Sequence, residues 1–387
     1  MDSEIQPPTP EPVPGPPVSD QPSWPDSPSP APIVPPYRGL RWIFIGDQGL
    51  RAGWSVAIFI VMFRLIGYAV TLTNRRFHYL GKQTEFTASS AFKSELASFV
   101  MVLFAVGIVA FIEHRSLLDF NLKGPRRTLN FFSGLAAGFL ALSTLVWTMD
   151  LGGWLHFGPH ALSGAQIFQY AALWGAAFLL VGCVEEGVFR CYLQSTLTRG
   201  INFWWALACI AAMCLPLVIR VKGNGVWGVY AIALLGLVPC ALLHLSKAQS
   251  SGFWQAAWVT STFFGFIHTG NNGENWIGIF AAALIGFVFC VSIWVTGSAW
   301  WAIGCHAAWD WAETYFYGTA DSGFVAKGHF LSTATAGNPL WSGGADGPEG
   351  SLLVIAVCLL LLLALLVIYG PRKPVQHELS GTEQFAG

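Results

Sequence analysis

Three groups of ionisable residues interrupt apolar stretches of the sequence. In chain order they are Glu185-Glu186 with Arg190, then His268, then His306 with Asp310 and Glu313. His306, Asp310 and Glu313 are spaced to share one helical face. Ionisable side chains in hydrocarbon are costly and usually mark function. Carboxylates and histidines carry out general acid–base catalysis, and a glutamate in a low-dielectric cavity suits the activation of water. These residues therefore predict a hydrolytic site.

Each group also has a structural interpretation. Glu186 and Arg190, at i and i+4, could form an ordinary intrahelical ion pair. His268 could bind the last carbonyls of its helix. His306 and Asp310 could form a structural hydrogen bond between helices. The residue types alone leave these alternatives open.

Glu185 differs from these residues because Phe189, and not a cation, stands one helical turn further on. A partner for its charge must come from another helix. At 1.5 Å per residue, Glu185 and His268 lie about 21 Å from the cytoplasmic ends of their helices, and His306 and Asp310 lie about 10 and 16 Å deep. Three helices therefore bring the four side chains to similar levels, which predicts one site.

The composition indicates a chain surrounded by lipid. Of its 387 residues 54% are hydrophobic and only 11% are charged, whereas soluble proteins carry roughly 25% charged residues. So few charges cannot cover a water-facing surface. The net charge of −1 gives no indication of a nucleic-acid partner. All eight cysteines lie in apolar runs without CxxC spacing, which predicts small core residues and neither disulfides nor metal ligands.

Apolar stretches able to cross roughly 30 Å of hydrocarbon recur along the chain. They lie at about 54–73, 97–113, 129–149, 167–198, 203–219, 226–245, 254–269, 276–296, 299–317 and 352–370. We expect an all-α, polytopic transmembrane bundle of about ten helices. Loop lysines and arginines place both termini in the cytoplasm, although the basic loop at 74–96 contradicts this rule.

The expected organisation has four parts. Residues 1–36 are rich in proline and predict a disordered cytoplasmic tail. N-terminal transmembrane helices follow at 37–166, and the catalytic membrane core spans 167–317. A polar loop, the last transmembrane helix and a short tail fill 318–387. Within the core, residues 203–251 contain two apolar runs without acids and predict an added helix pair.

The three groups resemble the motifs of the CAAX-protease and bacteriocin-processing family of intramembrane proteases. The family pattern is Glu-Glu-x-x-x-Arg, Phe-x-x-x-His and His-x-x-x-Asn or Asp, and here it reads Glu185-Glu186…Arg190, Phe264…His268 and His306…Asp310. The resemblance covers about residues 167–317. It implies that Glu185 and His268 activate a water, and that His306 and Asp310 stabilise the oxyanion. Glu186, Arg190 and Glu313 are expected to support the site.

Two departures from the family pattern matter. Position 310 is Asp where many members have Asn, and an ionised carboxylate would repel an oxyanion. The first and second motifs are also further apart than the family leads us to expect, which the added pair at 203–251 explains. A metal is an open alternative, because Glu185, His268, His306 and Asp310 could bind zinc. No His-Glu-x-x-His helix is present, and a metal-independent, glutamate-activated water is favoured.

The sequence therefore predicts an intramembrane endopeptidase, of the type also called metalloprotease, acting on a peptide or protein substrate. A lipidated substrate follows only from the family name. The expected location is the bacterial inner membrane, in contact with lipid. Two rivals stay open: a non-catalytic scaffold or bacteriocin-immunity factor, which predicts function without Glu185, and a proton-coupled transporter, which predicts flux in vesicles.

Overall fold

The computed structural model describes residues 41–77, 79, 86–220, 225–248, 250–271, 273–321 and 323–370. The tail predicted at 1–36 and the tail after residue 370 lie outside the described residues. The chain divides into two units, and every element discussed below belongs to the unit that begins at Phe44. The short helix α1 (Arg41–Phe44) precedes it.

Helices dominate this unit. The longer ones are α2 (Ala52–Phe77), α3 (Ala88–Ile112), α4 (Arg127–Leu151), α5 (Ala165–Glu186), α7 (Phe203–Arg220), α8 (Gly225–Leu245), α9 (Ser251–His268), α10 (Trp276–Thr296), α11 (Trp300–Asp310) and α13 (Leu352–Tyr369). The shorter ones are α6 (Gln194–Thr198), α12 (Pro339–Ser342), two π-helices, η2 (Gly187–Leu193) and η3 (Trp311–Tyr317), and two 3-10 helices, η1 (Leu117–Asp119) and η4 (Pro348–Gly350).

Strands are confined to two small antiparallel pairs in the described residues. β1 (Ile45–Gly46) pairs with β2 (Gly49–Leu50), and β3 (Leu155–Phe157) pairs with β4 (Thr333–Thr335). The pairing of β3 with β4 ties the loop after α4 to the polar connection that follows η3. The predicted all-α class is therefore confirmed.

A helix occurs at each of the ten stretches that were predicted to cross the membrane. In the described chain, seven helices are long and apolar enough to span: Ala52–Phe77, Ala88–Ile112, Arg127–Leu151, Ala165–Thr198, Val226–Leu245, Trp276–Thr296 and Leu352–Tyr369. Phe203–Ile219 is apolar but shorter. The helices that carry His268 and His306, α9 and α11, are outside this set. Seven spans establish a multi-pass integral membrane protein.

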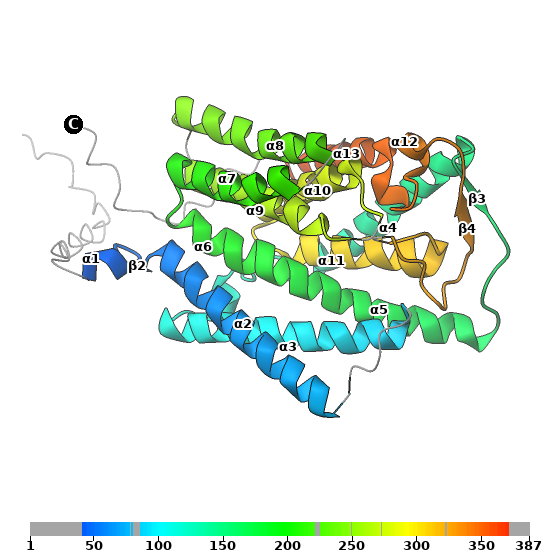
Figure 1. The fold of residues 1–387 in the computed structure, drawn as a ribbon, viewed down its shortest axis with the longest axis horizontal. Helices are drawn as coiled ribbons and strands as arrows, with labels where there is room; N and C mark the ends of the chain where they lie inside the picture. Colours follow the sequence, from blue (N-terminus) through cyan, green and yellow to red (C-terminus); the bar gives the residue numbers. More distant parts are fainter. Residues whose placement is uncertain are drawn as a thin grey trace, which may run out of the picture. The chain divides into compact units, whose positions relative to one another are not determined.

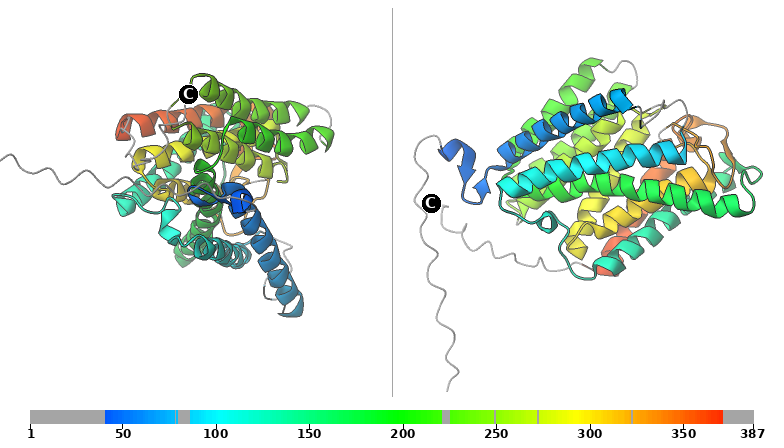
Figure 2. Two further views of the ribbon diagram at one scale, coloured as in Figure 1. Left: turned by 90° about the vertical axis from the view of Figure 1, so that its left-hand side faces the viewer. Right: turned by 90° about the horizontal axis from the view of Figure 1, so that it is seen from below.

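The arrangement of the helices places α11 at the centre of the site. It packs closely against α4 and α5 and also contacts α10. The helices α3 and α5 run side by side in two views of the unit (Figures 1 and 2). The predicted added pair forms α7 and α8, which pack on each other and on α9. Its accessory role stays a prediction.

Glycines allow α4 and α11 to approach closely. Gly134 and Gly138, four residues apart on α4, face the backbone of α11, and Gly304 on α11 faces α4 in return. A Cβ atom at Gly138 would collide with the carbonyl oxygen of Cys305, and one at Gly304 with that of Phe131. Small residues at such spacing let membrane helices pack backbone against backbone. This contact fixes the position of the helix that carries His306.

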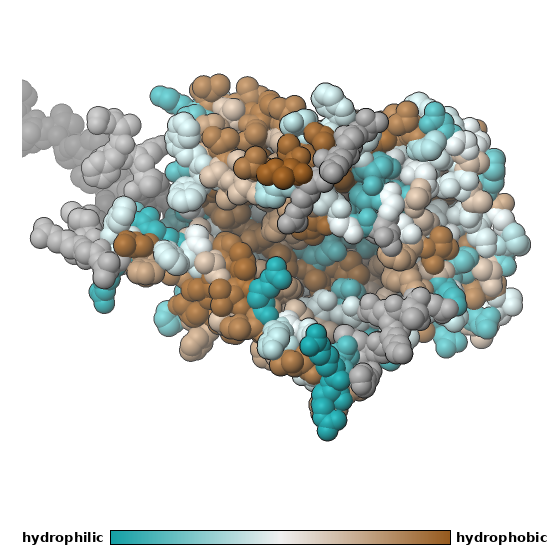
Figure 3. Space-filling view, viewed as in Figure 1, coloured by the Kyte–Doolittle hydropathy of each residue, from teal (hydrophilic) through white to brown (hydrophobic). Residues whose placement is uncertain are grey.

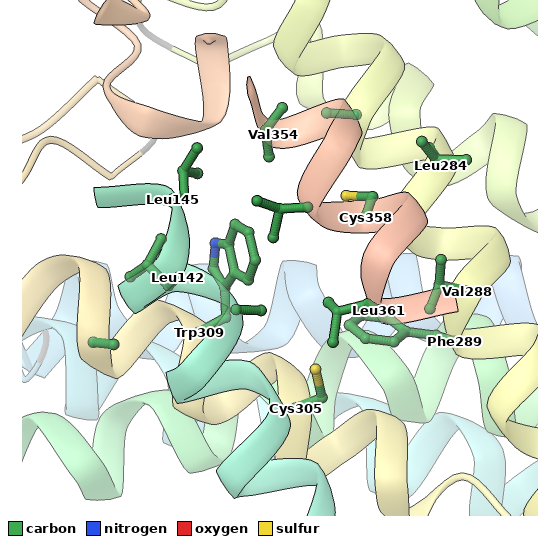
Figure 4. Close-up of a cluster of buried hydrophobic side chains, with 14 of the residues drawn as sticks. Leu142, Leu145, Leu284, Val288, Phe289, Cys305, Trp309, Val354, Cys358 and Leu361 are labelled. Atoms are coloured by element: carbon green, nitrogen blue, oxygen red, sulfur yellow. The ribbon is translucent and has the colours of Figure 1, made fainter. Parts of the chain in front are cut away.

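Apolar side chains fill the interior and also cover much of the outside. Figure 4 shows Trp309 of α11 among side chains of α4, α10 and α13, including Leu142, Cys358 and Leu361. On the face seen in Figure 3, hydrophobic residues cover much of α7, α8 and the first part of α2, whereas the far end of α2 and the region near β3 and β4 are more hydrophilic. Exposed apolar surface of this extent fits contact with lipid.

Candidate active site

The four residues predicted to be catalytic line one cavity of about 490 Å³. Glu185 reaches it from α5, His268 from the last residue of α9, and His306 and Asp310 from α11. Side chains of α3, α10, α13, the turn after α9 and the polar connection complete its walls. The convergence of three helices that was expected from depth is present in the structure, although the role of each residue stays a prediction.

The first motif stands where α5 changes into the π-helix η2, which begins at Gly187. π-helical turns often occur at functional sites. Glu186 Oε2 lies 3.1 Å from Arg190 Nε, and neither side chain is exposed to solvent. The structural ion pair considered for these two residues is therefore present. A buried pair of this kind is costly to break because the remaining charge loses its partner.

Glu186 also holds the histidine of the third motif. Its Oε1 lies 2.7 Å from Nδ1 of His306. An ionised carboxylate only accepts hydrogen bonds, so Nδ1–H of His306 donates. The other ring nitrogen, Nε2, lies 3.9 Å from Oε2 of Glu185 and 3.6 Å from Oδ2 of Asp310. Both distances exceed hydrogen-bond length, which leaves Nε2 available to another group in the cavity.

The two adjacent glutamates occupy different environments. Glu186 is enclosed, whereas the side chain of Glu185 is 32% exposed and lines the cavity. Successive residues of a helix point in directions about 100° apart, so one can enter the protein interior while the other faces the cavity. Glu185 Oε2 has no hydrogen-bond partner within the described part of the chain. Glu185 is thus the carboxylate that can reach water.

His268 has a defined tautomer. Its Nδ1 lies 2.7 Å from the carbonyl oxygen of Phe264, one helical turn earlier. A carbonyl only accepts, so Nδ1 carries the proton and Nε2 presents a lone pair. His268 therefore binds a carbonyl near its helix end, as the structural interpretation proposed. It also lines the cavity, where a neutral imidazole with a free Nε2 can accept a proton from water.

Phe264 joins the second motif to the first. The guanidinium carbon of Arg190 lies 4.3 Å from the centre of its ring, a favourable cation–π distance. Gly286 on α10 leaves room for this arginine, because a Cβ atom there would lie 2.6 Å from Nη2 of Arg190. The ring of Phe264 therefore packs on Arg190 while its carbonyl orients His268. Any residue at position 264 would supply the carbonyl, so the packing of the ring on Arg190 is the contact that requires an aromatic side chain there.

Glu313 is separated from the other predicted residues. It is 1% exposed and is not among the residues that line the cavity. Its Oε2 accepts a hydrogen bond of 3.1 Å from Nε1 of Trp309, which also donates to Oε1 of Glu349 at 2.9 Å. Glu313 belongs to η3, where the wider π-helical turn departs from the regular spacing. Its contacts connect it to acids of the polar connection.

Four further acids line the cavity, and sequence reasoning assigned none of them. They are Glu95, Glu274, Asp321 and Glu349. Glu95 was placed in a loop but belongs to α3. The other three come from the segment after α9 and from the polar connection before α13, which fold back over the cavity. No pattern in the sequence predicts that these two segments fold over the cavity.

Zinc sites require ligand atoms about 2 Å from the metal. Within the described ranges, no group of three or more His, Cys, Asp or Glu side chains is arranged to hold a metal ion. The geometry therefore does not fit the zinc site considered for Glu185, His268, His306 and Asp310, and no step below passes through a metal. All eight cysteines have free thiols, as expected for core residues.

Comparison with known proteins gives one match. Residues 239–312 match the family described as Type II CAAX prenyl endopeptidase Rce1-like. The matched segment contains Phe264…His268 and His306…Asp310, whereas Glu185 lies outside it. No curated protein and no solved structure matches the chain. The match confirms the predicted family resemblance, and at family level it supports a CAAX-type intramembrane endopeptidase.

Proposed function

We propose that this chain is an intramembrane endopeptidase in which Glu185 activates the attacking water. The observation that carries the proposal is the bond between Glu186 and His306. It joins the first motif, outside the matched segment, to the third motif, within it. The same bond directs Nε2 of His306 toward Glu185 and Asp310.

The reaction follows from the donors and acceptors around the cavity. A water near Glu185 and Nε2 of His268 gives a proton to Glu185 as its oxygen attacks the scissile carbonyl carbon. The carbonyl becomes an oxyanion, and Nε2–H of a protonated His306 donates to it. Glu185 then returns the proton to the leaving amine as the carbon–nitrogen bond breaks. A carboxylic acid and an amine are released, and every proton is accounted for.

General-base catalysis contributes about 10²- to 10⁴-fold to such rates, and one oxyanion donor contributes about 10²- to 10³-fold. His306 is suited to the second role because Glu186 fixes its ring and Arg190 balances the charge of Glu186. Glu186 and Arg190 are in this proposal positioning residues, which act through His306.

Asp310 has a defined part in the proposal. Its carboxyl lies 3.6 Å from Nε2 of His306, and in its protonated form it can donate to the oxyanion as an asparagine would. Asp310→Asn should therefore keep peptidase activity within about tenfold of the wild type and extend it to higher pH. The measurement is the pH–rate profile of both proteins. A large loss at all pH values would instead make Asp310 an ionised partner of His306.

A cleavage screen tests the function itself. The full chain would be purified in detergent and incubated with a peptide library, with Glu185→Ala as the control and product ends mapped by mass spectrometry. Cleavage by the wild type alone is the expected result. Flux of a solute in vesicles without any cleavage would favour the transporter, and a cellular function that survives Glu185→Ala would favour the scaffold.

Three finer predictions belong to the same screen. Metal assistance predicts that a chelator abolishes cleavage and that zinc restores it. A lipidated substrate predicts that a prenylated peptide is cleaved faster than its unmodified counterpart. Location in a bacterial inner membrane predicts that the chain fractionates with that membrane in a bacterial host.

A further inference from the structure

A second group of acids lies at the end of the cavity formed by the α9–α10 turn and the polar connection. Glu274 and Glu349 line the cavity, and Asp346 lies beside Glu274. Asp346 is 1% exposed, and its carboxyl group lies against the carboxyl of Glu274 and the backbone N–H of Asn275. We call Glu274, Asp346 and Glu349 the acidic end of the cavity.

Two of these carboxylates converge on one point. A Cβ atom added to Gly278, at the start of α10, would collide with Oε1 of Glu274 and Oδ2 of Asp346. Gly278 itself lines the cavity. The two carboxylate oxygens therefore occupy the room that a side chain at position 278 would need.

The lining of the cavity is rich in acids. Among the described residues that line it there are six acids and no lysine or arginine. The two histidines of the lining, His268 and His306, belong to the reacting groups described above. The nearby acid Asp321 adds further negative charge to the acidic end. Burying several carboxyl groups together without a cation disfavours their ionised form, and a positively charged ligand lowers that cost.

We propose that the acidic end is a specificity site that binds a lysine or arginine side chain of the peptide substrate. This rests on the proposed function and names the substrate class. The cavity is continuous from Glu185 to Glu274 and Glu349, so one peptide can place its scissile bond at the first and a basic side chain at the second. A carboxylate or an acidic side chain is repelled at the same place.

A basic side chain fits this space better than a metal ion does. Within the described ranges no cluster of three ligands is arranged around a metal position. A long lysine or arginine can instead extend through the cavity and place its charged group between Glu274 and Asp346. Trp309 lines the cavity and donates a hydrogen bond to Glu349. These two side chains form one wall of the space proposed for the basic side chain.

The protonation of the acidic end supports a cationic ligand. Burial, and then the charge of Asp346, raise the pKa of Glu274 to about 9. Burial raises the pKa of Asp346 to about 7, and burial followed by the charge of Asp321 raises that of Glu349 to about 8. A bound ammonium group favours the ionised carboxylates. Affinity for a lysine peptide should therefore rise between about pH 6 and pH 9.

The test is a binding measurement that does not require turnover. The full chain carrying Glu185→Gln would be titrated, in detergent, with fluorescent peptides that differ only in one central residue: lysine, norleucine or glutamate. Hydrogen bonds to charged groups contribute about 1.5–3 kcal/mol, so the lysine peptide should bind roughly ten- to hundredfold more tightly than the norleucine peptide. The glutamate peptide should bind most weakly.

Further substitutions in the same chain test which residues cause the preference for the lysine peptide. Gly278→Ala, whose Cβ atom would displace the carboxylates of Glu274 and Asp346, and the triple change Glu274→Gln, Asp346→Asn and Glu349→Gln should each abolish the lysine preference. Asp150→Asn removes an acid that does not line the cavity and should leave the preference intact. Thermal unfolding would establish that each variant is folded. If these variants do not fold, the comparison of the three peptides on the Glu185→Gln chain, whose acidic end is unaltered, still tests the proposal.

Equal affinity for lysine and norleucine peptides, or no binding of any peptide, would overturn the proposal. Tight binding of Ca²⁺ without discrimination among the peptides would overturn it in favour of a metal site. The proposed peptidase function is judged separately, from cleavage of the same peptides by the wild type. Lysine preference without cleavage would reject the peptidase and retain the cationic site.

Discussion

The two ends of the cavity differ in whether the charge of their buried carboxylates is compensated by a cation of the protein. At the end that holds the proposed catalytic residues (the reacting end), the carboxylate of Glu186 lies against both Arg190 and His306, so its charge is compensated within the protein. At the acidic end, Glu274 and Asp346 face one another over Gly278 without a cation among the described lining residues. Both ends are buried, and both contain carboxylates.

The difference indicates two tasks. The hydrogen bond from His306 to Glu186 holds the histidine in one orientation, which is what catalysis requires of a positioned histidine. A group of buried carboxyls without a cation tends to hold its protons in the free protein, and a positive ligand favours the ionised form. The first end therefore supplies fixed catalytic groups, and the second supplies selectivity. Three changes, two substitutions and a change of pH, test this difference between the two ends.

The largest effect should come from Glu186→Gln. The change leaves Arg190 buried without its counter-charge and weakens the bond to His306. Loss of one member of a buried pair costs about 3–5 kcal/mol, and the variant should unfold at a clearly lower temperature or fail to be extracted. Glu185→Gln is the matched control, because Glu185 is partly exposed and has no ion pair with an arginine or lysine in the described chain. Equal stability of the two variants would contradict the contrast.

The second effect is a dependence of stability on pH. The carboxyls of Glu274, Asp346 and Glu349 have raised pKa values of about 9, 7 and 8, against 4.5, 3.8 and 4.5 ordinarily. The folded protein therefore retains protons that the unfolded chain releases. Stability falls with pH wherever the folded state binds more protons than the unfolded state. The midpoint temperature of thermal unfolding should therefore drop by several degrees from about pH 5 to pH 9.

The control for this second prediction is the triple change Glu274→Gln, Asp346→Asn and Glu349→Gln. Its unfolding midpoint, measured in the same detergent, should vary much less over the same range. A wild type that becomes more stable as pH rises would show that these carboxyls are paired in the folded state.

The smallest effect should come from Trp309→Phe. The indole Nε1 donates to both Glu313 and Glu349, and phenylalanine keeps the ring without the donor. Loss of a buried hydrogen bond costs about 1–3 kcal/mol, so chemical or thermal unfolding should shift slightly. Selectivity for lysine peptides should change more than the rate of cleavage, because Glu349 belongs to the acidic end. A large loss of rate with unchanged selectivity would place Trp309 at the reacting end instead.

Much of the reacting end could be predicted from the sequence. Intramembrane acids and histidines are rare, so Glu185, His268, His306 and Asp310 stood out by type and depth, and all four line one cavity. The i, i+4 spacing of Glu186 and Arg190 predicted their pair. The bond from Glu186 to His306 was not predicted, because 120 residues separate the two. Only the packing of α11 on α5 brings them together.

The acidic end could not be predicted by the same reasoning. Acids in polar loops are ordinarily solvated, and Glu274 and Glu349 were indistinguishable from such residues. The fold buries them because the polar connection packs over the cavity, and its position depends on tertiary contacts such as β3 with β4. The π-helical segments after Glu186 and Asp310 also leave no simple pattern in the sequence, which explains why Glu313 was expected on the face of His306.

The central claim is that Glu185 activates the water that cleaves the peptide. The most direct test is the kcat of Glu185→Gln on a peptide that the wild type cleaves, at a temperature where both proteins are folded. Glutamine keeps the size of the side chain but cannot accept the proton, so kcat should fall by about 10²- to 10⁴-fold while peptide affinity stays within about tenfold of the wild type. Turnover of the variant within tenfold of the wild type would contradict the account and remove Glu185 from the mechanism.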